Sequence, residues 1–472
     1  MAPPICPLNA PSPEAPYFTP AHLTSPGTPT TLTSQTPTLF TPLTIRATTL
    51  RNRILVAPMC QYSTAPTGPL AGALTDYHVA TLGHYALKGA SLTFIEATGV
   101  QARGRISPNC PGLWTDAQIP GVKRVADFVR SQGGVVGVQL AHAGRKASVV
   151  APWVAAEYRK RKGWGPGSVR ASEEVGGWPA DVVGPMGGEA EAWDGLGGSE
   201  EGGYCVPRAL TEGEIAELVL DWGRAAKRAV EAGIQVVEIH AAHGYLLHQF
   251  LSPVTNRRTD GYGGSFEGRI RLLKEVVLEV RRNIPVDMPL FLRVSSTEWL
   301  EGTEVERTVG SGKSWNVEDT LRLAAMLPDW GVDLLDVSSG GNHKEQLVDM
   351  FKSKDYQVKI ADRIRKEMKR QGKSLLIGAV GLITEAEQAK GIVELNADTN
   401  GASSGDASIG DEAKAAVSMT EKGSGGKEPM ADVILVARQF MREPEWVLRV
   451  AWQLGVDIAW PNQFLRVRFP KL

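Results

Sequence analysis

The chain has 472 residues, of which 42% are hydrophobic and 22% are charged, and its formal net charge is −1. This is the composition of an ordinary globular protein, and the near-zero charge gives no electrostatic reason to expect nucleic acid or a membrane surface as a partner. No apolar stretch approaches the length that a bilayer-spanning helix needs.

The four cysteines lie at positions 6, 60, 110 and 205 without Cys-x-x-Cys spacing. This spacing supports neither a disulfide framework, a structural zinc site nor an iron–sulfur cluster. Such cysteine usage fits a reducing compartment, and the N-terminus lacks the basic flank and apolar core of a secretory signal. We therefore expect a cytoplasmic protein.

Residues 1–36 are rich in Pro, Thr and Ser and are predicted to be a disordered tail, followed by one globular domain over 37–472. Two amphipathic helices are predicted, at 211–233 and 266–283. Short apolar runs, each predicted to be a buried strand, lie at 54–59, 92–97, 135–140, 235–240, 290–294, 333–337, 375–379 and 432–437.

Eight strands alternating with helices indicate a parallel sheet, and eight is the number that closes a (β/α)8 barrel, or TIM barrel. A doubly wound open sheet is the alternative. It would carry a Gly-rich dinucleotide turn after its first strand, whereas the run 54–59 is followed by Cys-Gln-Tyr-Ser. The barrel is therefore favoured.

Two segments interrupt the alternation. Residues 161–207 are loaded with Gly, Trp and acidic residues, and a loop of this length at a catalytic face is usually a lid or a substrate wall. Residues 396–429 contain Gly- and Ser-rich stretches and are predicted to be a flexible surface insertion. Neither carries a recognisable chemical motif.

Polar residues crowd the end of the fourth predicted strand, where His240, His243 and Tyr245 follow an apolar run. A single histidine is usually a satisfied polar residue, but two histidines and a tyrosine at the carboxyl end of a barrel strand favour a site. Both imidazoles can donate hydrogen bonds to a substrate oxygen, and the phenol can pass on a proton.

The other strand ends converge on the same rim. Arg293 lies within an apolar strand and needs an anionic or strongly accepting partner, either a ligand or a structural salt bridge. Glycines after strand seven and Arg438 after strand eight match the usual phosphate seat of this fold. Together with Gln139, which can pair with a pyrimidine edge, these groups suit flavin mononucleotide (FMN).

Three segments resemble the Old Yellow Enzyme family: 57–63 (Ala-Pro-Met-Cys-Gln-Tyr-Ser), 139–146 (Gln-Leu-Ala-His-Ala-Gly-Arg-Lys) and 240–245 (His-Ala-Ala-His-Gly-Tyr). Cys60 with Tyr62, and a His-His pair rather than His-Asn, are similar to the thermophilic-like class. The resemblance runs from about 39 to 466. It implies a barrel with non-covalent FMN that NADPH or NADH reduces and that then reduces activated alkenes in a ping-pong cycle.

The resemblance also implies site residues. Substrate would meet Tyr62, His240, His243 and Tyr245, with Tyr245 protonating the alkene. The segment 461–466 resembles one by which this class inserts an arginine, here Arg466, into a neighbouring subunit of a homo-oligomer; a surface arginine is the alternative. The residues that would contact FMN are Ala57, Pro58, Met59, Cys60, Ala97, Gln139, Arg293, Gly378, Gly381, Ala437 and Arg438.

One departure from the family pattern is Ala437, which stands where a glycine is usual. Its methyl group would crowd the phosphate if the backbone there needed a positive φ. Rival functions stay open. One is alkene isomerisation, or the reduction of a specialised secondary metabolite, in the same site; a non-catalytic barrel is a further alternative, against which the presence of Tyr245 argues. Another is a metal-dependent hydrolase using His142, His240 and His243; it lacks nearby carboxylates at ligand spacing, and Glu238 is expected to point away from the partners of His240.

Overall fold

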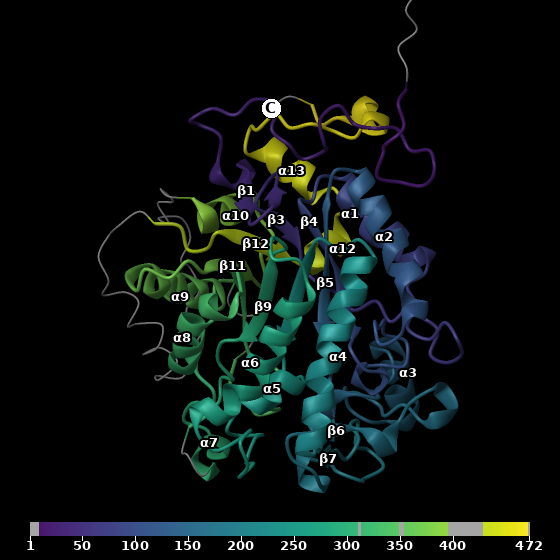
Figure 1. The fold of residues 1–472 in the computed structure, drawn as a ribbon, viewed down its shortest axis with the longest axis vertical. Helices are drawn as coiled ribbons and strands as arrows, with labels where there is room; N and C mark the ends of the chain where they lie inside the picture. The colour runs from purple at the N-terminus through teal and green to yellow at the C-terminus, as the bar shows by residue number, and fades with distance from the viewer. Residues whose placement is uncertain (1–8, 310–312, 349–353, 395–427, 471–472) are drawn as a thin grey trace, which may run out of the picture.

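A closed barrel of eight parallel strands forms the centre of the computed structural model, which describes residues 9–309, 313–348, 354–394 and 428–470 (Figure 1). The predicted barrel is confirmed, and each predicted run lies on one strand. In their order around the barrel the strands are β3 (Ile54–Val56), β4 (Leu92–Gly99), β5 (Val135–Ala141), β8 (Val236–Ala241), β9 (Leu290–Ser295), β10 (Leu334–Ser338), β11 (Leu376–Val380) and β12 (Val433–Val436).

Helices cover the outside of the barrel (Figure 1). The helix predicted at 266–283 is α6 (Phe266–Asn283), and the one predicted at 211–233 is α4 (Glu212–Glu231), whose first turn is capped by the Thr211 side chain. The other α-helices of the described residues are α1 (Asp76–Leu87), α2 (Ile119–Ser131), α3 (Pro152–Lys162), α5 (Leu246–Leu251), α7 (Glu304–Thr308), α8 (Val317–Met326), α9 (Val358–Arg370), α10 (Ala386–Val393), α12 (Arg438–Arg442) and α13 (Trp446–Gln453).

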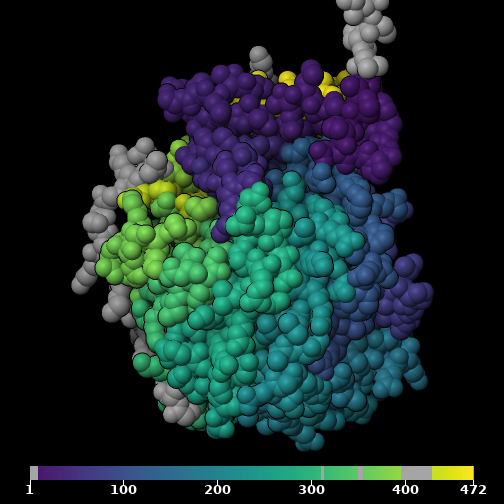
Figure 2. All heavy atoms as spheres, in the orientation of Figure 1, coloured from purple at the N-terminus to yellow at the C-terminus, as the bar shows by residue number. Residues whose placement is uncertain are grey.

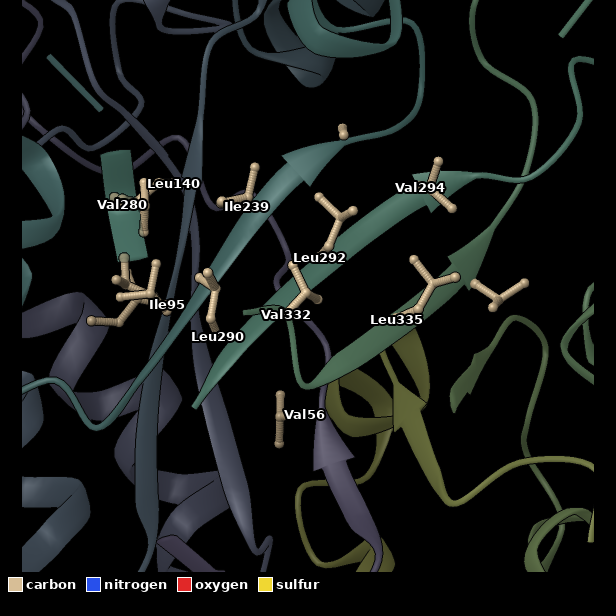
Figure 3. Packing of buried hydrophobic residues seen from close by; sticks show 14 of the residues in the cluster. Val56, Ile95, Leu140, Ile239, Val280, Leu290, Leu292, Val294, Val332 and Leu335 are labelled. Carbon is tan, nitrogen blue, oxygen red and sulfur yellow. The ribbon is translucent and has the colours of Figure 1, made fainter. Parts of the chain in front are cut away.

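The strands are apolar on both faces because helices cover one face and the barrel interior covers the other. Outward side chains such as Ile239 and Leu292 belong, with Val280 of α6, to the apolar cluster between strands and helices (Figure 3). Inward side chains such as Phe94 and Phe291 fill the interior, with ring centroids 6.0 Å apart. The alternation along β9 places Arg293, two residues after Phe291, on the inward face.

A hairpin of β1 (Leu43–Ile45) and β2 (Thr48–Leu50) closes the end of the barrel at which the strands begin. Its Ile45 and Leu50 pack on the first residues of several strands, including Leu92 and Val135. The opposite end, where the strands finish, is left for the loops that carry the polar residues.

Residues 9–36 lie along the protein, whereas the sequence predicted a disordered tail (Figure 2). Gly27 and Thr30 donate backbone hydrogen bonds to the carbonyls of Ala459 and Asp457. Farther along, Glu14 pairs with Arg130 of α2. The composition gave no sign of this because backbone and side-chain hydrogen bonds and an ion pair, rather than an apolar face, hold the segment.

The insertion predicted at 161–207 begins in the last residues of α3 and continues through short turns to β6 (Val183–Gly184) and β7 (Arg208–Ala209). α3, β6 and β7 lie at the end of the barrel opposite the termini (Figure 1). Most of the second insertion, 396–427, falls outside the described residues. No helix among the residues described is long and apolar enough to cross a membrane.

Candidate active site

His240, His243 and Tyr245 lie together at the end of β8. The His240 ring stands edge-on to both others, with centroids 5.2 Å from His243 and 5.0 Å from Tyr245. The turn that follows β8 brings this about, because His243 and Gly244 both have a positive φ, of 58° and 71°. Adding a Cβ to Gly244 would place it 2.3 Å from the carbonyl oxygen of Gly341, so only glycine fits this close approach.

The tautomer of His240 is fixed by its surroundings. The backbone N–H of Ala242 donates to His240 Nδ1 at 3.2 Å, so the proton of the neutral ring resides on Nε2. Burial, followed by the charges of His243 and Arg293, holds the pKa of His240 well below its ordinary value. The ring is therefore a neutral donor through Nε2–H.

His243 is held by hydrogen bonds of both its backbone and its side chain. Its backbone N–H donates to Ser295 Oγ at 2.9 Å, and its Nε2 lies 2.7 Å from Ser338 Oγ. Ser339 Oγ donates to Gln357 Oε1 at 2.9 Å, whereas Ser338 Oγ lies 3.5 Å from the same oxygen. The Ser338 hydroxyl can therefore donate to His243 instead. In that arrangement the His243 proton resides on Nδ1. Burial keeps the pKa of His243 well below its usual range.

The Tyr245 hydroxyl makes no hydrogen bond to any residue within the described ranges, although its ring is enclosed by His240 and Lys146. Burial, then the nearby Cys60 and Tyr62, raise the pKa of Tyr245 well above its ordinary value. Tyr245 therefore keeps its proton at neutral pH and can deliver it to an acceptor.

Below these rings, a polar layer crosses the barrel interior from β5 to β10. Gln139 Nε2 donates to Glu238 Oε1 at 2.7 Å, and Arg293 forms a buried ion pair with Asp336. Burial and the charge of Asp336 raise the pKa of Glu238 to about 8. The structural salt bridge considered for Arg293 is thus present, but Arg293 Nη2 still has no partner within the described structure.

The expectation that Glu238 points away from the partners of His240 was wrong. Residues two apart on a strand face the same side, so Glu238 and His240 both point into the barrel, where each feels the charge of Arg293. Glu238 is nevertheless engaged by Gln139 rather than by either histidine.

A cavity of about 450 Å³ extends from His243 and Arg293 to the ends of β11 and β12. The described residues that line it include three arginines, Arg293, Arg438 and Arg442, and no aspartate or glutamate. Ala57, Gly381 and Ala437 also line it. Such an arginine-rich lining favours an anionic ligand.

Three of the predicted cofactor residues differ in their backbone requirements. Gly381 has φ +112°, and a Cβ there would lie 2.6 Å from Gln357 Nε2. Ala437 has φ −107°, so its methyl group imposes no left-handed strain. Gly378 lies within β11, where a Cβ would meet the Leu435 side chain at 2.6 Å; it does not line the cavity.

The segment after β3 borders the same rim. Glu96 Oε2 accepts from the backbone N–H of Gln61 at 2.9 Å and so fixes the course of the chain beyond Pro58 and Met59. Tyr62, at φ +51°, and Cys60 pack on a buried patch that contains Ala97 and Cys110. A hydrogen bond to the Cys110 thiol, then burial, raise the pKa of Cys60 well above its ordinary value, so its thiol stays protonated.

Two predicted residues lie apart from this group. Arg466 is exposed in the C-terminal segment, which packs on residues 27–30 at the end of the barrel where the strands begin. His142 Nδ1 accepts from the N–H of Gly144 at 3.1 Å, and its ring faces Gly104 rather than the other two histidines. No group of three His, Cys, Asp or Glu side chains in the described ranges is arranged to hold a metal ion.

Lys146 is a site residue for which sequence reasoning assigned no role. Its ammonium group donates to the carbonyls of His243 at 2.9 Å and Gly341 at 3.0 Å and lies 5.3 Å from the Tyr245 ring centroid. Burial, then the neighbouring Arg145, lower the pKa of Lys146 to about 7. Its place in the segment 139–146 was the available signal.

A family model described as NADH:flavin oxidoreductase / NADH oxidase matches residues 38–400. The chain belongs to this family. It is 40% identical over 449 residues to NADH:flavin oxidoreductase FG08077 of Gibberella zeae, an alignment that spans 95% of this chain and 93% of that protein. It is 33% identical over 429 residues to an NADPH dehydrogenase of Bacillus subtilis, spanning 91% of this chain and 98% of that one.

Solved structures of the same fold accompany these relatives. An Old Yellow Enzyme homologue from Zymomonas mobilis superposes with a TM-score of 0.57 at 24% identity, covering 92% of this chain and 97% of that one. Morphinone reductase in complex with tetrahydroNAD gives a TM-score of 0.55 at 26% identity, covering 90% and 93%. The protein is thus an NAD(P)H-dependent flavin oxidoreductase, and its fold is that of the Old Yellow Enzyme homologue.

Proposed function

We propose that this oxidoreductase is an FMN-dependent ene-reductase that uses NADPH or NADH to reduce the C=C bond of an activated alkene. The observation that carries the proposal is the pair of neutral histidines at the end of β8, whose donating N–H groups adjoin a protonated tyrosine. A carbonyl or nitro oxygen held by such donors draws electron density from the conjugated alkene.

The residues present fit FMN. Its phosphate suits the end of the cavity lined by Gly381, Ala437, Arg438 and Arg442, because no aspartate or glutamate is among the described residues that line the cavity. The unpartnered Nη2 of Arg293 suits an electron-rich oxygen of the ring system. Gln139 Nε2 gives one of its two N–H donors to Glu238, so its second N–H and its carbonyl oxygen are left for pairing with a pyrimidine edge.

When bound, FMN supplies the hydride acceptor for the nicotinamide and the hydride donor for the β carbon of the alkene. His240 Nε2–H and His243 Nδ1–H hold the activating oxygen and stabilise the charge that builds on it. Tyr245 gives its proton to the α carbon. Tyr62 borders the bound alkene, and the segment 58–60 with Ala97 lines the approach to it.

The Cys60–Tyr62 and His240–His243 pairs support membership of the thermophilic-like class. In this proposal Arg466 reaches substrate only from a neighbouring subunit of a homo-oligomer, since it lies at the far end of its own barrel. Size-exclusion chromatography with light scattering tests whether the protein is a homo-oligomer. A monomer at the concentration used in the assays would remove Arg466 from the site.

The experiment is anaerobic reduction of 2-cyclohexenone by NADPH in D2O, with product analysis by NMR. Deuterium from solvent is expected at the α carbon, and hydrogen from the nicotinamide at the β carbon. Absence of the saturated ketone, or solvent deuterium at the β carbon, would contradict the proposed reaction. Recovery of an isomerised alkene instead would assign the site to isomerisation.

A further inference from the structure

Aromatic side chains from distant parts of the chain gather around Tyr245. Tyr62, Trp178, Tyr204 and Tyr245 all pack on one buried patch of small side chains that includes Ala97, Ala141, Ala143, Ala147 and Cys110. Trp178 and Tyr204 belong to the insertion 161–207. All four of these aromatic residues are only half buried.

Trp193, also from the insertion, connects this group to the cavity. Its indole Nε1 donates to the carbonyl of Gly341 at 3.0 Å, the same carbonyl that accepts from Lys146 at 3.0 Å, and Gly341 lines the His243 end of the cavity. The Lys146 ammonium lies 4.7 Å from the Trp193 ring centroid and 5.3 Å from that of Tyr245. Trp193 is therefore fixed beside the proton donor by a cation that both rings share.

The polar edges of the insertion rings are occupied. Trp178 Nε1 donates to the carbonyl of Arg103 at 2.9 Å, and the Tyr204 hydroxyl accepts from Ser168 Oγ at 2.9 Å. The Trp193 and Tyr204 rings touch, with centroids 5.0 Å apart. With both indole N–H groups occupied, Trp178 and Trp193 offer a ligand mainly their apolar ring surfaces.

Trp153 extends the group to the surface. It lies in the first turn of α3, and its ring meets the edge of Tyr62 with centroids 5.7 Å apart. Its side chain is 59% exposed, and its indole N–H bonds to no residue in the described ranges. Through Tyr62, Trp153 joins the aromatic group on the buried patch to the surface of the protein.

We propose that Trp153, Trp178, Trp193 and Tyr204 form an aromatic wall, supplied by α3 and the insertion, that selects activated alkenes bearing a planar aromatic substituent. This inference rests on the proposed ene-reduction. The activating oxygen is held by the two histidines, and the aryl group stacks on the wall. Two of the three N–H donors of Lys146 are taken by backbone carbonyls, which hold the ammonium group between Trp193 and Tyr245.

The test compares a small substrate, 2-cyclohexenone, with an aryl substrate, benzylideneacetone. The specificity constant kcat/KM is measured with each, and the aryl-to-small ratio is compared among the wild type, Trp153→Ala, Trp193→Phe and Trp193→Ala. We expect the ratio to fall about tenfold in both alanine variants and less in Trp193→Phe, which keeps a ring; tenfold corresponds to about 1.4 kcal/mol of transition-state binding.

Trp164→Ala is the matched control, because Trp164 lies in the same insertion but its aromatic and cation–π contacts within the described ranges are with Tyr158, Arg159 and Lys162. This variant should keep the wild-type ratio. An unchanged ratio in Trp153→Ala and Trp193→Ala, or an equal fall in Trp164→Ala, would overturn the wall.

A binding measurement separates failure of the wall from failure of the reaction. Calorimetry on the holoenzyme compares benzylacetone with cyclohexanone, neither of which has an alkene to reduce. Tighter binding of the aryl ketone that is lost in Trp193→Ala supports the wall even if no alkene is turned over. Equal binding of both ketones in wild type and variant contradicts it even if alkenes are reduced.

Discussion

Replacing Gly381 by alanine tests the phosphate end of the cavity directly. The residue has φ +112°, which L side chains rarely adopt, and a Cβ there would lie 2.6 Å from Gln357 Nε2. That amide cannot simply swing away, because its Nε2 donates to the carbonyl of Val380 at 2.7 Å and its Oε1 accepts from Ser339 at 2.9 Å.

The expected cost has two parts. Holding alanine at this φ costs about 1–3 kcal/mol, and displacing a buried amide from its partners costs about 1–3 kcal/mol more. If the backbone shifts to relieve the strain, the cavity wall moves with it. We therefore expect Gly381→Ala to destabilise the protein by about 3 kcal/mol and to weaken FMN binding by at least about tenfold.

The control is Gly372→Ala, at φ +66° with open space around the added Cβ. This variant carries conformational strain alone, of about 1 kcal/mol, and should bind FMN as the wild type does. FMN affinity is measured by quenching of flavin fluorescence, and stability by thermal melting with and without FMN. Equal FMN affinity in Gly381→Ala and wild type would refute the assigned cavity.

The remaining predictions concern protons. Tyr245→Phe should slow alkene reduction by about 100-fold or more while flavin reduction by NADPH stays far less affected, since the phenol proton serves only the alkene; stopped-flow absorbance separates the two steps, and equal slowing contradicts the role. Ser338→Ala should weaken phenol binding, followed by its charge-transfer band, because His243 loses the hydroxyl that places its proton on Nδ1; unchanged affinity would reject that tautomer. Burial lowers the pKa of His142 to about 3 against 6.5 when unfolded, so its stabilising contribution is present above pH 6.5 and declines as pH falls towards 3. Between pH 7 and 5 the free energy of unfolding should fall by about 2 kcal/mol because of His142. Urea unfolding at the two pH values should show this part of the fall in the wild type but not in His142→Asn. The asparagine oxygen can still accept the hydrogen bond from Gly144.

The sequence predicted the elements that depend on local pattern. The predicted strands lie on the eight barrel strands because buried parallel strands are near-continuous apolar runs, and α6 matches because its apolar positions recur at the helical period. The polar residues that follow β8 and β12 could be assigned to one site, because the carboxyl ends of all barrel strands meet at the same rim.

What the sequence did not show depends on contacts between distant residues. Pairing of Arg293 with Asp336 is set by strand register, and the negative φ of Ala437 cannot be read from its identity. Trp193 lies in a Gly-rich insertion without periodicity, yet one hydrogen bond to Gly341 brings it to the site. The order of residues 9–36 arises from backbone bonds to residues 457–459, which composition does not encode.

The most direct test of the account is the visible spectrum of the purified protein during an anaerobic titration. A yellow protein with the absorbance of oxidised flavin should be bleached by NADPH and regain its colour when 2-cyclohexenone is added. A colourless protein that fails to bind added FMN would contradict the cavity assignment. A flavoprotein that NADPH bleaches but no activated alkene reoxidises would contradict the role given to His240, His243 and Tyr245.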